Sequence, residues 1–310
     1  MRLNTVFWGN SEFVLPSLEV LARETRLGAI FTGPDQAVGR NLKSVKIPEP
    51  KLYGNLHGIP VFQNEDLKTE DLPGEIRKFE PDLMVVISYG KILPERIFSL
   101  PPLGTVNLHA SLLPDYRGAS PIQQALLNGD GKTGVTIQKI NAQLDAGNIL
   151  LQKELEIEPG DTYLTLRPKL AQESGKLLEE YLRILTKEET LPEYPQNDKV
   201  SYCSKITKQD GEIRWEQSAR EIFNKWRAFI HWPGVFCSFR GGALKLKQLE
   251  ILSESQGKPG EIIRADKGGL WVRCGSGAIS LLMVQPPNKN AMAYQDFLNG
   301  YRLKAGELFI

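Results

Sequence analysis

Residues 105–114 read Thr105-Val106-Asn107-Leu108-His109-Ala110-Ser111-Leu112-Leu113-Pro114, a short apolar run that ends in polar side chains and a proline turn. A run of this length bounded by turn residues predicts a buried strand. Asn107 and His109 are two residues apart in that strand, so both side chains project from the same face. Further along the chain, Leu144-Asp145-Ala146-Gly147 adds a carboxylate. The sequence therefore predicts that an amide, an imidazole and a carboxylate share one pocket.

Other apolar runs, at residues 5–8, 28–31, 83–87 and 135–140, alternate with helix-like stretches at 11–23 and 121–127. This alternation predicts βα units, and continuously apolar strands are typical of a doubly wound parallel sheet covered on both faces. Ligands of such sheets bind at the carboxyl ends of the strands, where Gly9, Tyr89 and Asn107 would lie. The first strand is followed by Gly9-Asn10-Ser11-Glu12 and no Gly-x-Gly-x-x-Gly turn, so we expect no dinucleotide cofactor. Ser11 is a candidate N-cap for the helix that follows.

A helix predicted over residues 162–185 closes the first domain, with Pro168 kinking it or marking its start. The pattern then changes. Residues 190–199 are polar and contain two prolines, as expected of an interdomain linker. After a helix at 218–230, short β-like runs at 235–239, 244–252, 261–263, 270–274 and 278–284 predict a small barrel. We therefore expect domains at residues 1–189 and 207–310, joined by a linker at 190–206.

The three polar residues suit acyl transfer to an amine. Attack on a formyl carbon builds negative charge on oxygen, which Asn107 and His109 can stabilise as preorganised donors. Asp145 can orient His109 and accept the amine proton, directly or through a water. No Ser or Cys nucleophile is needed, because the amine itself attacks. On spacing alone, however, an Asn-x-His pair is more often a satisfied polar pair, and an Asp before Ala-Gly is more often a turn residue.

The wider motif Asn-Leu-His-Ala-Ser-Leu-Leu-Pro-x-Tyr-Arg-Gly, with a downstream Gly-Val-Thr-Ile and Leu-Asp-x-Gly, resembles the folate-dependent formyltransferase family. The resemblance implies that Asn107, His109 and Asp145 form the catalytic triad. It also implies that 10-formyltetrahydrofolate is the co-substrate and that no metal is required. The residues implied to contact the folate are Ser111, Leu112, Leu113 and Pro114, with Tyr89 and Gly90 around the pteridine.

Additional segments resemble the members of this family that act on tRNA, from residue 3 to residue 305. They are Val6-Phe7-Trp8-Gly9-Asn10-Ser11-Glu12-Phe13, Tyr89-Gly90-Lys91-Ile92-Leu93-Pro94, residues 205–215, Arg227-Ala228-Phe229 and residues 296–300. The implied reaction moves a formyl group to the α-amine of methionine on initiator tRNA, in the cytoplasm. The implied architecture is a Rossmann-like catalytic domain followed by an OB-like tRNA-binding domain.

The long basic loop at residues 32–48 follows the second strand, and the resemblance implies that it grips the acceptor end of the tRNA. It departs from the family pattern at Gln36-Ala37-Val38, where Arg-Pro-Ala is usual. The departure concerns the conformation of the loop and its tRNA contacts, and leaves the triad unchanged. The tRNA-binding candidates are Arg40, Lys43 and Lys46 in this loop, with Lys205 and Lys208 further along.

Composition is consistent with a polyanionic substrate. Residues 201–310 contain 16 Lys and Arg against 10 Asp and Glu, whereas the first two hundred contain 22 against 27. Phosphate contacts supply most sequence-independent affinity for nucleic acids, so a basic third fits tRNA binding. Without the family resemblance, a solvated surface explains this imbalance equally well.

Cysteine spacing and hydropathy exclude other classes. Cys203, Cys237 and Cys274 lie far apart without metal-ligand spacing, and we expect them to be packing residues. For His57 and His231 we expect surface or core positions. No apolar run approaches the roughly 20 residues of a membrane helix, so we expect no membrane association. We also expect a monomer.

Two other functions are also compatible with the sequence. A formyltransferase acting on an amino sugar of a nucleotide would use the same triad, and an inactive homologue could serve as an RNA-binding module. Glycinamide ribonucleotide formylation normally needs only one domain, so the length of 310 residues argues against it. A formylation assay with each amine acceptor would separate the remaining functions.

Overall fold

The computed structural model describes residues 2–38, 44–64, 66–187, 191–197, 199–253 and 256–309. The chain divides into two compact units. The first comprises Met1–Pro121, Lys132–Ile157 and Leu166–Ser204, and the second comprises Ile122–Gly131, Glu158–Thr165 and Lys205–Ile310. The second unit thus includes two short stretches that precede the C-terminal third in sequence. The boundaries expected at 189 and 207 stay a prediction.

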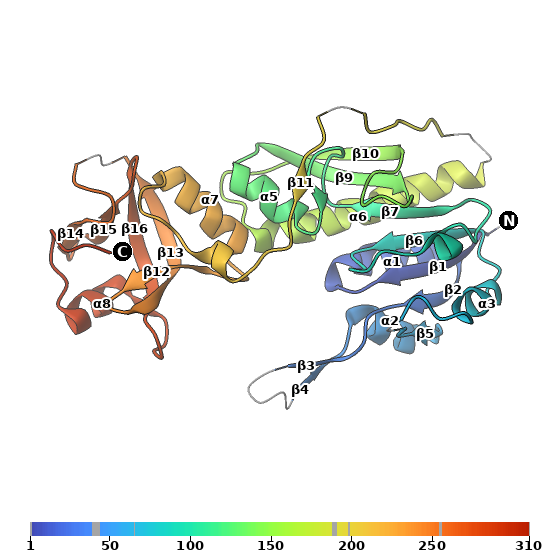
Figure 1. The fold of residues 1–310 in the computed structure, drawn as a ribbon, viewed down its shortest axis with the longest axis horizontal. Helices are drawn as coiled ribbons and strands as arrows, with labels where there is room; N and C mark the ends of the chain where they lie inside the picture. The colour runs from blue at the N-terminus through green and yellow to red at the C-terminus, as the bar shows by residue number, and fades with distance from the viewer. Residues whose placement is uncertain are drawn as a thin grey trace. The chain divides into compact units, whose positions relative to one another are not determined.

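The first unit is built on a seven-stranded sheet (Figure 1). Its strand order is β10-β9-β7-β6-β1-β2-β5. Neighbouring strands from β5 to β7 are parallel, and β9 is antiparallel to both β7 and β10. The strands are β1 (Asn4–Gly9), β2 (Arg26–Phe31), β5 (Val61–Phe62), β6 (Leu83–Ile87), β7 (Thr105–His109), β9 (Lys132–Lys139) and β10 (Ile149–Glu156).

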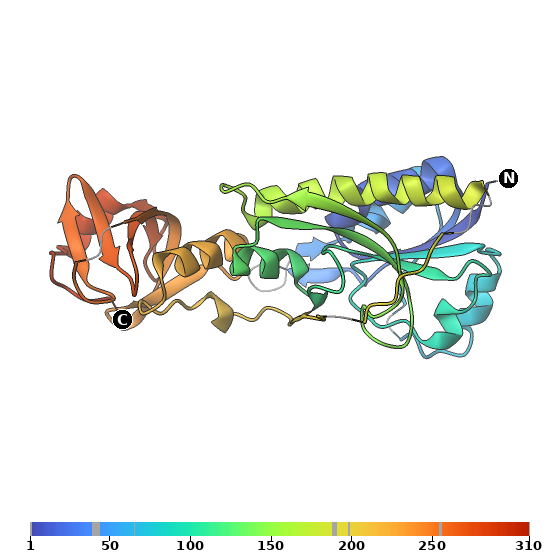
Figure 2. The same ribbon diagram turned by 90° about the horizontal axis from the view of Figure 1, so that it is seen from above.

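Helices cover both faces of this sheet (Figure 2). On one face, α6 packs against α1 where Gly175 meets Pro16, and Gly54 of α2 meets Ile30 of β2. On the other face, α3 and α4 pack against the alternate strand residues Val6, Trp8 and Met84. This two-sided burial explains why β6 is apolar and buried along its whole length. The helices are α1 (Leu15–Glu24), α2 (Glu49–His57), α3 (Leu72–Arg77), α4 (Glu95–Phe98) and α6 (Tyr163–Thr186).

The predicted fold class is confirmed: a parallel-dominated α/β sheet is followed by an antiparallel β domain. Two local expectations differ from the structure in part. Pro168 does not mark the start of α6, because the helix begins at Tyr163 and continues through it, and the alternative of a kink stays a prediction. Ser11 lies at the N-cap of a short 3-10 helix (Glu12–Val14), but its side chain makes no capping hydrogen bond. The strands β5 and β10 were not predicted.

The loop at residues 32–48 contains a short hairpin. Its strands β3 (Gln36–Val38) and β4 (Ser44–Lys46) pair in antiparallel fashion, with Gln36 opposite Lys46. The loop is anchored by Asp35, which accepts hydrogen bonds from Lys51 and Gln63. Arg40 and Lys43, two of the tRNA-binding candidates, lie outside the described residues.

The second unit contains a six-stranded antiparallel sheet with the order β12-β13-β16-β15-β14, and β17 pairs with β16. The pairings of the described residues run from β12 to β14, and closure into the expected OB-like barrel stays a prediction. Its elements are α5 (Pro121–Asn128, which belongs to this unit except for Pro121), the 3-10 helix η3 (Gln209–Gly211), α7 (Ala219–Phe229), β12 (Val235–Phe239), β13 (Gly242–Leu252), β14 (Ile262–Asp266), β15 (Gly269–Arg273), β16 (Ala278–Gln285), β17 (Met292–Ala293) and α8 (Tyr294–Tyr301).

The core of the second unit is rich in aromatic side chains. Phe239 contacts Phe297, Tyr301 and Phe309, and Trp215 stacks on Phe309. Each fully buried side chain of this size contributes about 1.5–3 kcal/mol to the free energy of unfolding. Helix α7 begins at Ala219, and its N-cap Ser218, the predicted start, forms a capping box with Glu221. Among the described residues, no helix is long and apolar enough to cross a membrane.

Candidate active site

Asn107 and His109 lie at the carboxyl end of β7, which the five-residue run Thr105–His109 forms as predicted. The neighbouring strand β9 is in register so that Asn107 is opposite Gln138 and His109 is opposite Thr136. Residues directly opposite each other on paired strands point to the same face of the sheet. The two strands therefore place four polar side chains on one face of the sheet, at the carboxyl end of β7.

Asp145 comes from the loop between β9 and β10. Its backbone has φ 49°, in the left-handed region that costs energy for a residue with a side chain. Gly147 follows in close contact with the chain, since a Cβ at this position would lie 1.7 Å from the Lys139 carbonyl oxygen. These two features bend the loop back over the strands, so that the Asp145 carboxylate reaches Asn107.

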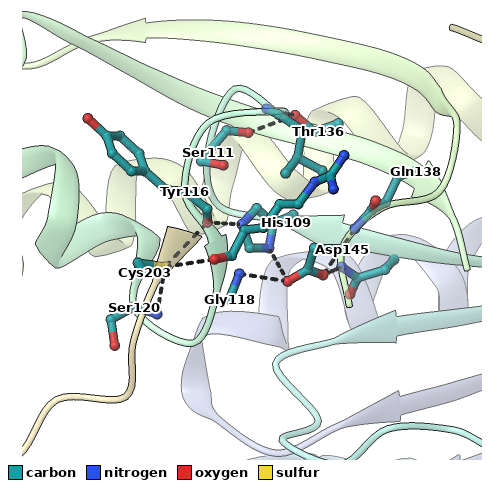
Figure 3. Close-up of polar contacts among 12 residues, drawn as sticks. His109, Ser111, Tyr116, Gly118, Ser120, Thr136, Gln138, Asp145 and Cys203 are labelled. Atoms are coloured by element: carbon teal, nitrogen blue, oxygen red, sulfur yellow. Dashed lines mark hydrogen bonds and ion pairs between the residues drawn. The ribbon is translucent and has the colours of Figure 1, made fainter. Parts of the chain in front are cut away.

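The Asp145 carboxylate faces hydrogen-bond donors on both oxygens. Oδ1 accepts from Asn107 Nδ2 at 3.2 Å and from Gln138 Nε2 at 3.0 Å. Oδ2 accepts from the backbone N–H of Gly118 at 2.9 Å and lies 3.7 Å from His109 Nδ1. Only 12% of the Asp145 side chain is exposed. The expected trio is thus assembled from two separate segments, β7 and the loop before β10, as Figure 3 shows for His109 and Asp145.

His109 is buried, with 6% of the residue exposed, and its ring lies between two acceptors. Nε2 is 2.9 Å from the carbonyl oxygen of Tyr116. Because a carbonyl oxygen only accepts, Nε2 carries a proton in this arrangement. Nδ1 lies 3.7 Å from Asp145 Oδ2, which is too long for a hydrogen bond.

The turn at Ser111–Pro114 directs two of the folate candidates inward. Ser111 is fully buried, and its hydroxyl donates to the Asp115 carbonyl at 2.5 Å. Leu113 is buried and donates its N–H to Thr136 Oγ1. Leu112 and Pro114 are half-buried. Ser111 and Leu113 therefore shape the turn, whereas Leu112 and Pro114 keep part of their surface available.

Tyr89 and Gly90 follow β6 at the same end of the sheet. The Tyr89 ring is buried and contacts Trp8 edge to face at 5.2 Å. Burial raises the pKa of the Tyr89 hydroxyl to about 12, so this group stays neutral. Gly90 is exposed with φ 80°, a conformation that favours glycine. The surface of this turn is thus formed by backbone rather than by the tyrosine ring.

The described tRNA candidates Lys46, Lys205 and Lys208 are all exposed. Lys46 lies 3.7 Å from Glu49. His57 and His231 are exposed and contact Tyr53 and Tyr163 through their rings. The three cysteines are free and buried. Within the described ranges, no three His, Cys, Asp or Glu side chains gather in a way that could hold a metal ion.

Both parts of the chain match the same enzyme family. Residues 10–182 match the family described as formyl transferase, and residues 205–302 match the formyl transferase C-terminal domain. A methionyl-tRNA formyltransferase from Sulfurihydrogenibium sp. (strain YO3AOP1) is 40% identical over 311 residues, which cover 99% of this chain and 100% of that protein. The chain belongs to the formyl transferase family.

Solved structures share this fold. An N-formyltransferase from Helicobacter canadensis, in complex with folinic acid and dTDP-3-aminofucose, aligns with a TM-score of 0.68 at 20% identity. The alignment covers 92% of this formyl transferase and 99% of that chain. HypX from Aquifex aeolicus, in complex with tetrahydrofolic acid, aligns with a TM-score of 0.65 at 15% identity over 100% of this chain and 51% of that one.

Sequence reasoning missed several groups that contact the trio in this formyl transferase. They are the Gln138 side chain, the Gly118 N–H and the Tyr116 carbonyl. A signal for Gln138 was present: Thr136 and Gln138 alternate with apolar residues in β9, and both are almost fully buried. Two polar residues on one face of a buried strand require partners. The backbone groups of Tyr116 and Gly118 left no comparable signal.

Proposed function

We propose that this protein transfers the formyl group of 10-formyltetrahydrofolate to the α-amine of methionyl initiator tRNA. The observation that carries the proposal is the convergence of Asn107, His109 and Asp145 at the carboxyl end of β7. Two proteins named methionyl-tRNA formyltransferase are 40% identical over 99% of this chain, which supports the choice of acceptor. The basic balance of residues 201–310 supports a polyanionic substrate.

In the proposed reaction the amine nitrogen attacks the formyl carbon, and the carbonyl π electrons move to oxygen. Asn107 and His109 donate to this oxyanion. When the C=O bond re-forms, the bond to N10 of the folate breaks. The amine loses one proton overall, which Asp145 accepts directly or through a water, and N10 gains one. Holding these groups in a dry, preorganised site lowers the barrier because little reorganisation is needed during reaction.

The substrate sites are proposed from position and exposure. The folate is placed along the Tyr89–Gly90 backbone and the exposed side of Leu112 and Pro114, with Ser111 and Leu113 supporting the turn from inside. The tRNA is placed against the exposed Lys46, Lys205 and Lys208. Arg40 and Lys43 lie outside the described residues and are assigned to the tRNA from the family resemblance alone. These assignments, together with the cytoplasmic location and the monomeric state, stay predictions.

The test offers three acceptors to the purified protein with 10-formyltetrahydrofolate: methionyl initiator tRNA, the same tRNA uncharged, and a nucleotide amino sugar. We expect formylation of the charged tRNA alone, read as formylmethionine after mild hydrolysis. Formylation of the amino sugar in preference to the charged tRNA would contradict the proposal and favour the sugar-modifying function. Binding of tRNA without any formylation would favour the inactive RNA-binding homologue.

A further inference from the structure

The polar segment expected to be a simple linker is fastened to the candidate active site. Tyr194 exchanges two backbone hydrogen bonds with Ile149, at 2.8 and 2.9 Å. Further on, β11 (Tyr202–Cys203) pairs in parallel with β8 (Arg117–Gly118). The Ser201 hydroxyl also accepts from the Tyr116 N–H at 2.9 Å. The described residues 194–197 and 199–203 therefore contact the start of β10 and the stretch at residues 116–118 that lies against His109 and Asp145.

Gln196 lies at the centre of a chain of side-chain hydrogen bonds. Its Oε1 accepts from Arg117 Nε at 2.9 Å. Its Nε2 donates toward Gln138 Oε1 at 3.1 Å, the Asp145 carbonyl at 3.1 Å and the Gly147 carbonyl at 2.7 Å. Gln138 Nε2 in turn donates to Asp145 Oδ1 at 3.0 Å. We call Arg117, Gln196, Gln138 and Asp145 the amide relay.

The donor and acceptor roles of these groups allow only one orientation of each amide in the amide relay. A guanidinium has only donors, so the group that faces Arg117 Nε is the oxygen of Gln196. The amide nitrogen of Gln196 must then face Gln138, which turns the oxygen of Gln138 toward it and its nitrogen toward Asp145. Reversing Gln196 would place its oxygen against three acceptors and a donor against a donor. Arg117 is 6% exposed, so water does not readily replace these bonds.

We propose that Gln196 is a positioning residue for formyl transfer, acting through Gln138 and the 145–147 loop on Asp145. This inference rests on the proposed function. Asp145 adopts a strained left-handed conformation, so its loop needs an external restraint. Gln196 supplies that restraint twice: it holds the backbone carbonyls of Asp145 and Gly147 directly, and it orients the amide that holds the carboxylate. Figure 3 shows Gln138 next to Asp145.

The first test replaces Gln196 by Met, which is similar in size but lacks the amide. We expect kcat for methionyl-tRNA formylation to fall about 10- to 100-fold, because small misplacements of reacting groups carry penalties of this order. KM for both substrates should stay within about two-fold, since removal of a transition-state interaction lowers kcat. Gln196→Glu keeps the acceptor for Arg117 and removes the donors, and we expect the same loss.

The matched control is Glu193→Gln. Glu193 directly precedes Tyr194 and binds the flanks of the same loop, through Lys139 and through Asn148 Nδ2 at 2.9 Å. It has no place in the amide relay, so kcat should equal that of the unmodified protein. A comparable kcat loss in Glu193→Gln would overturn the inference, because any loosening of the segment would then suffice.

A double-mutant cycle tests the route through Gln138. If both glutamines act on the same carboxylate, Gln138→Met combined with Gln196→Met should lower kcat little more than the more damaging single change. Independent, multiplicative losses would overturn the relay, as would unchanged kcat with raised KM in Gln196→Met. An unmodified protein that does not formylate methionyl-tRNA would overturn the proposed function itself. An active unmodified protein with an equally active Gln196→Met would overturn this inference alone.

Discussion

The catalytic trio and the described lysines expected to meet tRNA differ in how the fold holds them. His109 and Asp145 expose 7% and 12% of their side chains, and the carboxylate accepts from an amide of each neighbouring strand. Lys46 exposes 61% of its side chain and has one partner, Glu49, at 3.7 Å. Lys205 and Lys208 are exposed. Burial and hydrogen bonds thus hold the catalytic side chains in position, and we call these side chains and their partners the fixed region. The described lysines extend into solvent.

This difference follows from the two tasks. Forming a bond to a formyl carbon requires donors at fixed positions around one oxygen, which a buried network of hydrogen bonds can supply. Attraction of a polyanion depends on the number of charges near the surface and tolerates motion of each side chain. Changes in the trio should therefore cause large losses that salt hardly alters, and changes in the lysines should cause small losses that depend on salt.

The largest effect is expected for removal of an oxyanion donor. His109→Ala and Asn107→Ala should each lower kcat about 10²- to 10³-fold, because one such donor typically contributes this much. Substrate binding should change far less. Single-turnover rates with saturating methionyl-tRNA give the chemical step, and equilibrium binding gives the control. Near-normal single-turnover rates in either variant would remove that residue from the mechanism.

Asp145→Asn should lower kcat nearly as much, although the shape of the side chain is kept. Three donors bind the carboxylate, from Asn107, Gln138 and the Gly118 backbone. An amide would place its own donors against at least one of them and could no longer accept the amine proton. We expect a loss of about 10² in kcat, of the order of one misplaced catalytic group. Rates measured with and without added salt should fall by the same factor.

Gly118→Ala tests the backbone N–H that donates to the Asp145 carboxylate. Gly118 has φ 121°, and a Cβ there would lie 2.2 Å from the Cys203 carbonyl oxygen. The change should displace the N–H that binds Asp145, with a kcat loss of about 10-fold or more and a free energy of unfolding lower by about 1–3 kcal/mol. The measurements are kcat and urea unfolding.

The control for this change is Gly131→Ala, where no atom lies within 4 Å of the added Cβ. It should leave both kcat and the urea midpoint near those of the unmodified protein. If Gly118→Ala behaved like Gly131→Ala, the backbone contact from Gly118 to Asp145 would be dispensable for the site.

Much of the fixed region could be predicted because its determinants are local. The strand β7 follows from a short apolar run, and the common face of Asn107 and His109 follows from the two-residue period. The role of Asp145 required the family resemblance, since an Asp before Ala-Gly predicts only a turn. The turn itself is present, with the carboxylate aimed back at the strand by the left-handed backbone.

The remainder of the site depends on pairings between distant segments. Gln196 lies in a stretch whose prolines and polar residues predict a linker, yet it binds Arg117 and Gln138. Nothing in the local sequence indicates which buried amides such a residue will meet. The register of β9 on β7 likewise decides that Gln138 faces Asn107, and register is set by tertiary packing.

Among the residues expected to meet tRNA, Arg40, which lies outside the described residues, should give the largest effect when changed to Ala. Its guanidinium is expected to contact phosphates or bases of the acceptor end, so kcat/KM for methionyl-tRNA should fall about 10-fold, the loss of one charge-assisted hydrogen bond. Affinity for the folate should stay unchanged, because the loop is expected to lie away from the pteridine. Isothermal titration with a folate analogue provides that comparison. Equal losses for folate and tRNA would indicate a different role for the loop.

The smallest effects are expected for Lys205→Ala and Lys208→Ala. Each phosphate contact releases condensed counterions, so removal of one lysine should lower the slope of log affinity against log salt by about one unit. Affinity at low salt should fall several-fold, and the difference should shrink as salt rises. Lys176→Ala is the control, since this exposed lysine of α6 pairs with Glu173 and is not expected to meet tRNA. If the lysine variants and the control share one slope, the contact with tRNA must lie elsewhere, because no counterion would then be released at Lys205 or Lys208.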